Sequence, residues 1–419
     1  MSENKQLYRW LSQYMPKASE KRLVVLTGAR QTGKTTLVKK IYSGNRYINL
    51  DAPENRESIR SVSAYNWHKD VGEAVLDEAQ KEPSIFEKVK YSYDSGKISF
   101  TAMLGSAQIL LLHNIRETLA GRVFLYELWP LMLSEILAGN EIEPEKPLLE
   151  EILQLQSIDV LLNSKKEILL DDEAAKRKEA EAYLLKWGGM PELLQLNDDD
   201  KFKWLQSYEY TYLERDLSDL AKLKDLEPFR KFQRLTALRS AKLLNYAELS
   251  RDAGISLDSA RRYLEYLKLS YQTISLQPFY ENLTSSTVKS PKIYIVDIGI
   301  LRQLAGFSGE INGEIYETYV ISEIYKWIKS GQKNIDLFFY RTRSGMEIDL
   351  LIKSGEKFIG LEIKMGKKIG GADFSPMQAV AKKLGKRWLG GVCVYRGDRL
   401  YKLAEPAIWA VPSYRLFSP

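Results

Sequence analysis

Short apolar runs alternate with longer amphipathic stretches over the first 140 residues of the chain. The apolar runs predict buried strands at 23–26, 47–51, 74–76, 98–104 and 123–126, and the stretches between them predict helices. Strands that alternate with helices in this way are typical of a parallel sheet covered by helices. The fold class predicted for this part of the chain is therefore α/β.

After residue 140 the pattern becomes predominantly helical. Residues 140–225 are rich in Leu, Glu and Lys and contain few β-branched runs, which favours helices. Within 228–300, helices are predicted at 246–253 and 257–269, joined by a tight turn and followed by two strands. Two further strand-like runs within 346–364 predict a hairpin near the end of the chain.

These patterns divide the 419 residues into four predicted units. Before the first strand, Leu7, Trp10, Leu11 and Tyr14 stand at helical spacing, so residues 1–22 predict a helix. The units are a parallel-sheet domain, a helical region, a helix–turn–helix unit with two strands, and a C-terminal α/β domain. Their predicted bounds are 1–140, 141–227, 228–300 and 301–419.

The composition is that of an ordinary globular protein, with 44% hydrophobic and 28% charged residues. The net charge of +6 permits nucleic-acid binding without requiring it. The single cysteine, Cys393, excludes internal disulfides and a cysteine-based zinc site, and two histidines are too few for a histidine-rich metal site. The N-terminus lacks a signal-peptide core and no uncharged apolar run approaches ~18 residues, so a cytoplasmic protein without a membrane helix is expected.

A glycine-rich segment stands between the first strand and the helix that follows it. Residues 28–35 match the phosphate-binding pattern G-x-x-x-x-G-K-[ST] at every fixed position. Backbone N–H groups of such a loop point at phosphate oxygens, Lys34 reaches the β- and γ-phosphates, and the Thr35 hydroxyl ligates Mg²⁺. A plain glycine-rich turn is the alternative, but the flanking strand and helix favour nucleotide binding. The residues expected to bind ATP are Gly28, Ala29, Arg30, Gln31, Thr32, Gly33, Lys34, Thr35 and Thr36.

Polar residues at the ends of two later strands extend this predicted site. Asp77 and Glu78 follow the apolar run 74–76. Asp77 can hold Mg²⁺ through water, and Glu78 can orient or deprotonate the attacking water. A solvated loop is the alternative for an Asp-Glu pair taken alone. Ser106, after the run 98–104, is expected to touch the γ-phosphate or its attacking water.

Arg116 and Arg122 are two candidates for an arginine finger. Such a residue acts on the phosphate of a neighbouring subunit and would therefore require a homo-oligomer. The alternative for Arg122 is a structural arginine that precedes the strand at 123–126.

Several short motifs together resemble a group of prokaryotic AAA+ ATPases close to the origin-recognition and signal-transducing (STAND) branches. They are Gly-Ala-Arg-Gln-Thr-Gly-Lys-Thr-Thr (28–36), Asn-Leu-Asp (49–51), Leu-Asp-Glu-Ala-Gln (76–80), Leu-Gly-Ser (104–106), Leu-Ala-Gly-Arg (119–122) and Leu-Trp-Pro-Leu (128–131). The resemblance implies a P-loop AAA+ domain that binds and hydrolyses ATP with Mg²⁺. Trp-Gly-Gly-Met-Pro-Glu (187–192) is similar to an element in the lid region of the same family, so 141–227 is expected to form a helical lid.

The helix predicted at 257–269 displays Arg261, Arg262 and Lys268. Because it is the second helix of a helix–turn–helix and two β-like runs follow, the unit 228–300 has winged-helix character. A helix in this position can lie in the major groove, which makes DNA the predicted partner. Helix–turn–helix units also serve as plain packing modules, and that alternative stays open.

The C-terminal hairpin brings charged residues together. If 355–356 is its two-residue loop, Asp349 faces Glu362. In the same register Glu347 faces Lys364, and alternation places all four side chains on one face. The other face is predicted to hold Ile348, Leu350, Ile352, Ile359, Leu361 and Ile363. Two facing carboxylates repel unless a divalent cation lies between them, which predicts Mg²⁺ or Mn²⁺ there; the alternative is a solvated face with a Glu347–Lys364 ion pair.

The order Asp, then Glu-x-Lys, resembles the core of PD-(D/E)XK nucleases. In that family an upstream helix often supplies another acid, and Glu317 is the match here. Residues from about 200 onward also look like the uncharacterised domain that commonly follows this ATPase type and ends in a nuclease-like fold. The resemblance therefore implies a restriction-endonuclease-like domain with Asp349, Glu362 and Lys364 as catalytic residues, and with Glu317 as a further metal ligand.

Two functions are compatible with these patterns. The first is an ATPase that acts on DNA, with duplex contact by the winged helix and metal-dependent cleavage by the C-terminal domain. The second is a nucleotide-controlled switch or scaffold whose winged helix and nuclease fold serve only binding or docking.

Overall fold

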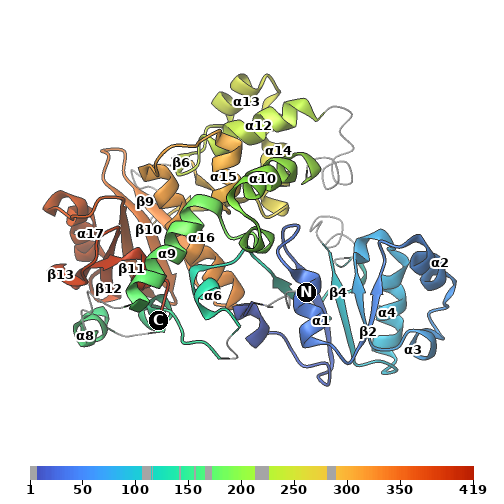
Figure 1. The fold of residues 1–419 in the computed structure, drawn as a ribbon. Coiled ribbons are helices and arrows are strands. Elements are labelled where there is room, and N and C mark those ends of the chain that lie inside the picture. Colours follow the sequence, from blue (N-terminus) through green and yellow to red (C-terminus); the bar gives the residue numbers. More distant parts are fainter. Residues whose placement is uncertain are drawn as a thin grey trace.

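The computed structural model describes residues 7–105, 115, 117–140, 143–154, 157–165, 172–212, 226–280 and 289–419. Figure 1 shows a smaller lobe, drawn in blue to cyan, and a larger lobe that contains most of the remaining elements. Within the described ranges, no helix is both long enough and apolar enough to span a membrane.

The smaller lobe is built on a parallel sheet of five strands in the order β2-β3-β4-β1-β5. The strands are β1 (Arg22–Thr27), β2 (Arg46–Asn49), β3 (Ala74–Asp77), β4 (Phe100–Leu104) and β5 (Val123–Glu127). The helical elements are α1 (Lys34–Ile41), α2 (Pro53–Ser61), α3 (Trp67–Asp70), η2 (Ala79–Lys81) and α4 (Ser84–Asp94). Every pairing of these strands is parallel, which confirms the predicted α/β layer.

Strand β1 lies between two neighbours and is apolar on both faces. Leu23 and Val25 pack into one hydrophobic cluster, whereas Val24 and Leu26 pack into another. All four side chains are fully buried, because helices cover both faces of a parallel sheet. The carboxyl end of β1 is thereby held in place, and the glycine-rich loop starts at this point.

The described residues 7–22 of the N-terminal segment do not form the predicted helix. Its described part contains a single 3₁₀ turn, η1 (Trp10–Gln13). The Tyr8 amide donates to the Gly139 carbonyl at 2.6 Å, and the Trp10 amide donates to the Glu135 carboxylate at 2.9 Å. Hydrogen bonds to distant residues therefore replace the expected helical ones, and Trp10 is buried in the core of the larger lobe.

Residues 141–227 are helical where the structure describes them, but they are divided between two sites in the fold. Helix α6 (Leu133–Ala138) precedes this part of the chain, whose elements are α7 (Leu148–Gln154), α8 (Ile158–Ser164), α9 (Asp172–Trp187), η3 (Pro191–Gln195) and α10 (Asp198–Tyr212). Helix α8 packs on the C-terminal strands, where Trp409 Nε1 donates to Asp159 at 2.6 Å. Helices α9 and α10 pack instead against α15 (Ile298–Ala305).

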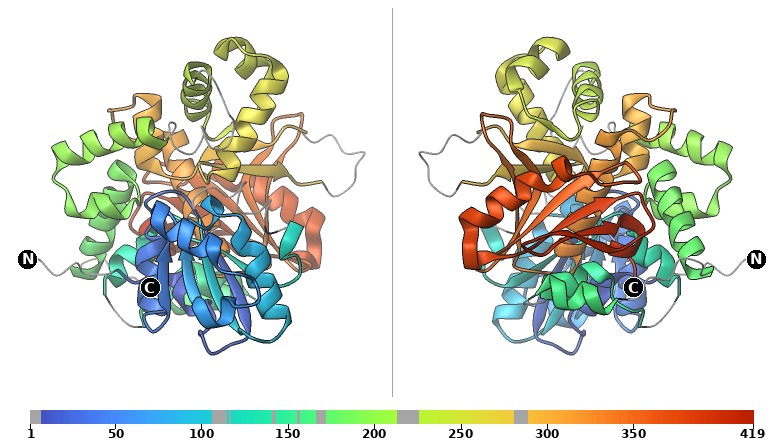
Figure 2. Two further views of the ribbon diagram at one scale, coloured as in Figure 1. Left: turned by 90° about the vertical axis from the view of Figure 1, so that its right-hand side faces the viewer. Right: turned by 90° about the vertical axis from the view of Figure 1, so that its left-hand side faces the viewer.

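The next part of the chain holds the predicted helix–turn–helix. Its elements are α12 (Glu227–Ala237), β6 (Lys242–Leu243), α13 (Tyr246–Ala253), α14 (Leu257–Leu269), β7 (Thr273–Pro278) and β8 (Lys292–Ile295). Helices α13 and α14 have the predicted bounds. Gly254 ends α13 in a left-handed conformation, and the Ser256 side chain caps α14 by accepting from the Ser259 amide at 3.1 Å. Both views of Figure 2 place these helices at the top of the molecule.

The larger lobe contains one mixed sheet of nine strands in the order β13-β14-β12-β11-β10-β9-β7-β8-β6. Its later strands are β9 (Asp336–Arg341), β10 (Glu347–Ser354), β11 (Lys357–Lys364), β12 (Trp388–Tyr395), β13 (Tyr401–Ala404) and β14 (Ile408–Pro412). The remaining helical elements are α16 (Gly313–Ser330), α17 (Gly371–Leu384), η5 (Gly385–Arg387) and α18 (Ser413–Leu416). Because β7 pairs with β9, strands of the predicted units 228–300 and 301–419 share one sheet.

Helices α16 and α17 cover opposite faces of this sheet. Val320 and Ile324 of α16 pack with Leu361 in one hydrophobic cluster, whereas Met377 of α17 packs with Leu351 in another. Strands β10 and β11 therefore have little access to solvent on either face. Charged residues on these two strands must find partners inside the protein.

A pair of glycines permits a close junction between α9, α15 and the segment that follows β5. Gly188 has φ +78°, and a Cβ at this position would lie 2.1 Å from Asp297 Oδ1. A Cβ at Gly189 would lie 2.2 Å from the Leu131 carbonyl oxygen. The Asp297 carboxylate accepts from the Gly189 amide at 2.7 Å and from the Ile300 amide at 3.1 Å, so it also caps α15. Only glycine allows backbones to approach this closely.

Candidate nucleotide-binding site and C-terminal carboxylate cluster

The glycine-rich loop connects β1 to α1 at the carboxyl edge of the parallel sheet. Gly28 has φ +148° and Gly33 has φ +91°, conformations that favour glycine. A Cβ at Gly28 would lie 2.2 Å from the Leu128 carbonyl oxygen, so a side chain has no room there. Gly33 is the N-cap of α1, which leaves the amides of the first helical turn available to an anion.

The Lys34 side chain folds into this loop instead of extending into solvent. Its Nζ donates to the Gly28 carbonyl at 2.9 Å and to the Ala29 carbonyl at 2.7 Å. Lys34 is 8% exposed. The Lys34 ammonium therefore lies where a bound phosphate would be, and phosphate oxygens can replace these two carbonyls as its hydrogen-bond acceptors.

The other loop residues differ in burial. Thr32 is buried, Arg30 is half-buried, and Gln31 is exposed with φ +61°. Tyr208 of α10 donates to the Arg30 carbonyl at 3.5 Å, so the larger lobe contacts the loop from outside. Thr36 is exposed in the first turn of α1.

Thr35 and Asp77 come from different elements and meet beside the loop. Thr35 Oγ1 donates to Asp77 Oδ2 at 2.7 Å, and the Tyr47 hydroxyl donates to the same oxygen at 2.5 Å. Burial and the bond to Asp77 raise the pKa of Tyr47, which keeps its phenol a donor. Tyr47 was not predicted to belong to the site; the only available signal was its position in a strand next to the Asp77 strand.

Glu78 follows Asp77 in a left-handed conformation with φ +54°. The Glu78 amide donates to Asp77 Oδ1 at 2.9 Å, and Gln80 Nε2 donates to Glu78 Oε2 at 2.6 Å. Left-handed backbone at a residue other than glycine costs energy and is common at functional sites. The turn places Glu78 at the sheet edge next to Asp77, and Gln80 orients its carboxylate.

Of the predicted sensor and arginine-finger residues, the structure describes Arg122. Ser106 and Arg116 lie outside the described residues. Arg122 makes a two-bond pair with Asp94, at 2.7 and 3.0 Å. Since Arg122 directly precedes β5, it lies at the amino edge of the parallel sheet, opposite the loop. This pair supports the structural alternative, and a finger role for Arg122 stays a prediction.

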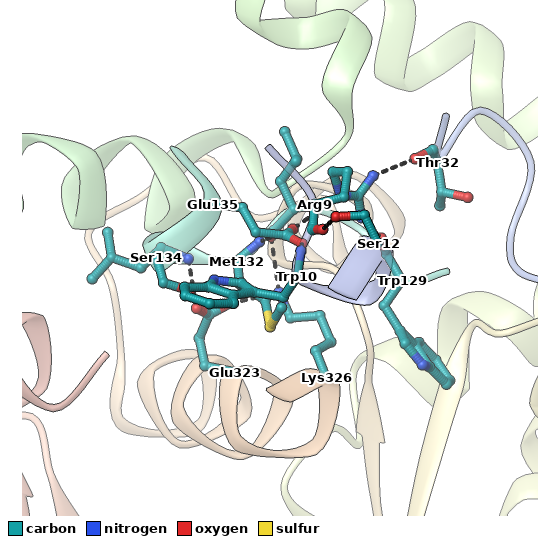
Figure 3. Close-up of polar contacts among 12 residues, drawn as sticks. Arg9, Trp10, Ser12, Thr32, Trp129, Met132, Ser134, Glu135, Glu323 and Lys326 are labelled. Carbon is teal, nitrogen blue, oxygen red and sulfur yellow. Dashed lines mark hydrogen bonds and ion pairs between the residues drawn. The ribbon is translucent and has the colours of Figure 1, made fainter. Parts of the chain in front are cut away.

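Arg9, which no sequence pattern singled out, supports the loop from behind (Figure 3). Its Nη1 donates to the Thr32 carbonyl at 2.7 Å and its Nη2 to the Trp129 carbonyl at 2.5 Å. Its Nε lies 3.1 Å from Glu135 Oε2, and both side chains are almost fully buried. The partners of Arg9 are distant in sequence, so only the tertiary structure identifies it.

The contacts around Arg9 continue into α16 (Figure 3). The Leu133 amide, in the same helix as Glu135, donates to Glu323 Oε2 at 2.8 Å. Lys326 Nζ donates to the Leu131 carbonyl at 3.1 Å. Glu323 and Lys326 both belong to α16. This helix therefore connects the residues around Arg9 to the larger lobe.

A second contact joins the base of the loop to the segment after α14. The Tyr271 hydroxyl shares a hydrogen bond with Thr27 Oγ1, and Thr27 is the last residue of β1. Tyr271 has φ +63° and packs edge-on against Trp129, with 4.9 Å between ring centroids. The helix–turn–helix unit therefore touches the strand that carries the loop.

The C-terminal hairpin has the predicted register between Leu350 and Leu361, but the ladder does not extend to Asp349 and Glu362, and the predicted alternation does not hold. Leu350 pairs with Leu361, as a two-residue loop at 355–356 requires. The pairing of β10 with β9 shifts between Ile348 and Leu351, which marks a bulge. Ile348 consequently packs on the α17 side, whereas Leu350 packs on the α16 side. The prediction that Ile348 shares a face with Leu350 is therefore wrong.

The charged residues of the hairpin separate into two contacting groups. Lys292 Nζ, from β8, lies 2.6 Å from Glu347 Oε1 and 3.7 Å from Asp349 Oδ1. Lys364 pairs with Glu362 at 2.9 Å. The predicted opposition of Glu347 and Lys364 is therefore wrong, because each of them has a different partner. Lys292 was not predicted, since nothing in the β8 sequence indicates carboxylate partners.

Glu317 of α16 joins the Lys292 group. Its Oε1 lies 3.0 Å from Lys292 Nζ and accepts from the Tyr294 hydroxyl at 2.8 Å. Burial, followed by the charge of Asp349, raises the pKa of Glu317 to about 7 and that of Glu362 to about 8. The neighbouring lysines act in the opposite direction but do not cancel these effects.

We expect Glu362→Gln to reduce the pH dependence of stability. The pKa of Glu362 rises from 4.5 to about 8 on folding, so the folded state binds the proton more tightly than the unfolded state does. This contribution to the free energy of unfolding is complete below pH 4.5 and is lost as the pH rises to about 8. Relative to the variant, the wild type should lose on the order of 1–3 kcal/mol between pH 5 and pH 8. Urea unfolding at several pH values measures this. The exposed Glu356→Gln on the same hairpin is the control, and equal slopes in all three proteins would contradict the prediction.

The two groups of acidic residues differ as sites for a divalent cation. Thr35 and Asp77 offer a hydroxyl and a carboxylate beside the loop, and this oxygen set fits Mg²⁺. In the C-terminal cluster, the Lys292 ammonium lies between the carboxylates. In the described part of the chain, no group of three or more His, Cys, Asp or Glu residues could hold a metal ion. The predicted ligands Asp349, Glu362 and Glu317 therefore do not fit a metal ion as they are arranged.

Three family models match successive parts of the chain. Residues 20–137 match an AAA domain. Residues 177–310 match a domain of unknown function (DUF8612), and residues 312–416 match another (DUF4143). The first match agrees with the parallel sheet and the glycine-rich loop of the smaller lobe. The match to an AAA domain supports ATP binding and hydrolysis.

Two relatives match most of the chain. The chain is 26% identical over 351 residues to the uncharacterized protein Rv2008c of Mycobacterium tuberculosis, covering 82% of this chain and 70% of the relative. It is 24% identical over 406 residues to the uncharacterized protein MJ1637 of Methanocaldococcus jannaschii, covering 87% and 80%.

Similar solved structures include two ATP-related proteins. AMPPCP-bound DnaA from Aquifex aeolicus is 15% identical, with 60% of this chain and 84% of that chain covered and a TM-score of 0.25. A signal-transduction ATPase (STAND) with a tetratricopeptide repeat sensor from Pyrococcus horikoshii is 12% identical, with 78% and 47% covered and a TM-score of 0.25. These scores are too low to support a conclusion about this chain.

Proposed function

We propose that this chain is an ATP-binding and ATP-hydrolysing switch that contacts DNA. The observation that carries the proposal is the convergence of Lys34, Thr35 and Asp77 at the glycine-rich loop. The match of residues 20–137 to an AAA domain supports it. ATP turnover by the purified chain, measured as phosphate release with and without duplex DNA, is the direct test.

The residues of the loop suit the chemistry of phosphoryl transfer to water. Loop amides and the Lys34 ammonium bind the β- and γ-phosphates, which places the γ-phosphate at the sheet edge. Glu78 orients or deprotonates the attacking water. Thr35 and Asp77 would hold Mg²⁺, which supplies charge neutralisation at the phosphates when it is bound.

A switch requires that the loop and the larger lobe respond to each other. Arg9 contacts the Thr32 carbonyl from behind the loop, and Tyr271 contacts Thr27 at its base. When phosphate draws Lys34 away from the Gly28 carbonyl, the loop backbone loses an internal hydrogen bond. The contacts of Arg9 and Tyr271 would transmit that change to α16 and to the segment after α14.

Helix α14 is the proposed DNA-contacting element, with β7 and β8 as the strands of a winged helix. Arg261 and Arg262 are exposed on it, and Lys268 is partly buried. Arg261 lies 3.4 Å from Asp258, and Lys268 lies 3.7 Å from Glu265. Exposed pairs of this kind are weak, so these cations remain able to exchange their carboxylates for DNA phosphates.

Replacing Arg261, Arg262 and Lys268 by alanine should weaken duplex binding about tenfold or more, and should lower the salt slope by up to about 3 units because fewer counterions are released. Fluorescence anisotropy at several salt concentrations measures both quantities. The control replaces three exposed lysines of α17 and η5, Lys382, Lys383 and Lys386, and should bind like the wild type. Equal affinity and slope in the α14 variant and the wild type would make the unit a packing module.

Metal-dependent DNA cleavage is the second candidate function. The family resemblance and the proximity of Asp349, Glu362 and Lys364 favour it. The contact of Lys292 with Asp349 weighs against it, and we therefore favour docking as the role of the C-terminal domain. Nicking of plasmid by the wild type with Mn²⁺, lost in Asp349→Asn while ATP turnover persists, would establish the nuclease instead.

A further inference from the structure

The centre of the C-terminal carboxylate cluster is occupied by a side chain of the protein itself. Lys292 Nζ lies 2.6 Å from Glu347 Oε1, 3.0 Å from Glu317 Oε1 and 3.7 Å from Asp349 Oδ1. These acids come from α16 and β10, while Lys292 comes from β8. The ammonium thus lies at the point where the oxygen atoms of two separate elements converge.

We propose that Lys292 is the resident cation of this cluster and takes the place of a divalent metal ion. The wild-type C-terminal domain then binds no catalytic metal at these carboxylates. This proposal concerns the larger lobe alone, so it stands or falls independently of ATP hydrolysis and of DNA contact by α14.

Cations of the protein already offset much of the local negative charge. The cluster contains five acids and three cations; the acids are Glu317, Glu347, Asp349, Glu362 and Asp373, and the cations are Lys292, Arg341 and Lys364. Glu347 is shared, because its Oε2 lies 3.1 Å from Arg341 Nη1. A divalent ion would add two positive charges beside an ammonium that is 4% exposed, and water would screen little of the resulting repulsion.

Lys292 is held in its position by contacts with acids from two elements. Its Nζ lies within 3.7 Å of Glu317, Glu347 and Asp349, and its side chain is 4% exposed. A second cation at this point would have to share these oxygen atoms with the ammonium.

The proposal also assigns Lys292 a place between two parts of the fold. It lies on β8, next to β7, and so belongs to the unit that contains α14. Its partners Glu347 and Asp349 lie on β10, in the hairpin. A neutral residue of similar size at 292 would leave three acids without this counter-ion, which are conditions that favour a divalent cation.

Binding of Mn²⁺ to the full chain, without nucleotide, tests the proposal by electron paramagnetic resonance. We expect the wild type and Asp349→Asn to bind Mn²⁺ equally. Lys292→Met should gain one site with affinity at least about tenfold higher than any site in the wild type, and Lys292→Met/Asp349→Asn should lose it. All four proteins retain Thr35 and Asp77, so any ion at the glycine-rich loop contributes equally to each.

Two results would overturn the proposal. One is a Mn²⁺ site in the wild type that Asp349→Asn removes, since the cluster would then bind metal despite Lys292. The other is a folded Lys292→Met protein that gains no site. If Lys292→Met does not fold, the comparison of wild type with Asp349→Asn decides alone, with equal binding in support and a lost site against.

Discussion

Lys34→Ala is expected to abolish nearly all ATP binding and hydrolysis. The Lys34 Nζ is held inside the loop by the Gly28 and Ala29 carbonyls, where it can form charge-assisted hydrogen bonds to the β- and γ-phosphates. Each such bond contributes about 1.5–3 kcal/mol. Loss of two of them lowers ATP affinity by about 100-fold or more. Titration with a fluorescent ATP analogue and measurement of phosphate release check both effects.

Glu78→Gln provides a comparison that separates binding from turnover. Glutamine keeps the size of the side chain and can still contact Gln80, but it cannot accept the proton of water. Binding should be unchanged, and turnover should fall by about 10²–10⁴-fold. Loss of binding in this variant would show that Glu78 acts mainly by holding the turn after β3.

Lys40→Ala is the matched control for the loss of a lysine in the same helix. Lys40 is exposed at the far end of α1, away from the loop. Its replacement should change neither ATP affinity nor turnover. If Lys34→Ala hydrolyses ATP at the wild-type rate, the loop is a structural turn and the proposed ATPase site is wrong.

The second large effect is expected at the glycine junction, where Gly188→Ala should destabilise the fold by about 3 kcal/mol or more. A Cβ at Gly188 would lie 2.1 Å from Asp297 Oδ1 and 2.6 Å from the Gly299 amide nitrogen. These distances are far below van der Waals contact. The Asp297 carboxylate would have to leave the Gly189 amide and would also lose its capping bond to α15.

Gly254→Ala isolates this steric effect from backbone conformation. Gly254 has φ +72°, close to the +78° of Gly188, but a Cβ there has no neighbour within 4 Å. The free energy of unfolding of the control should therefore fall only by the cost of an alanine in the left-handed conformation, about 1–2 kcal/mol. Urea unfolding followed by circular dichroism compares the two variants. Equal losses would mean that the junction can relax around the added methyl group.

Local signals in the sequence were sufficient for several parts of the fold. The parallel sheet, the loop at 28–35, and the bounds of α13 and α14 follow from short-range periodicity, turn residues and motif spacing. The register of the C-terminal hairpin follows from its two-residue loop, because that loop determines which residues oppose each other. Each of these features depends on residues that are close in the chain.

The same local reasoning was wrong where a distant contact intervened. A bulge in β10 moves Ile348 to the α17 side, because one extra residue changes the face that every residue before it presents. Residues 1–22 have a helical pattern, yet in the described residues 7–22 hydrogen bonds to Glu135 and Gly139 replace the helix. Periodicity does not report on such partners.

The class of the smaller lobe and the position of its phosphate-binding loop could be predicted from the sequence alone, since both depend on the order of a strand, glycines and a helix. Only the tertiary structure identified Arg9 behind the loop and Lys292 among the C-terminal acids. The sequence gives the type of a charged residue, but it does not show which distant residues lie beside that residue in the fold. Whether two carboxylates face a metal ion or an ammonium depends on which distant strand is brought beside them.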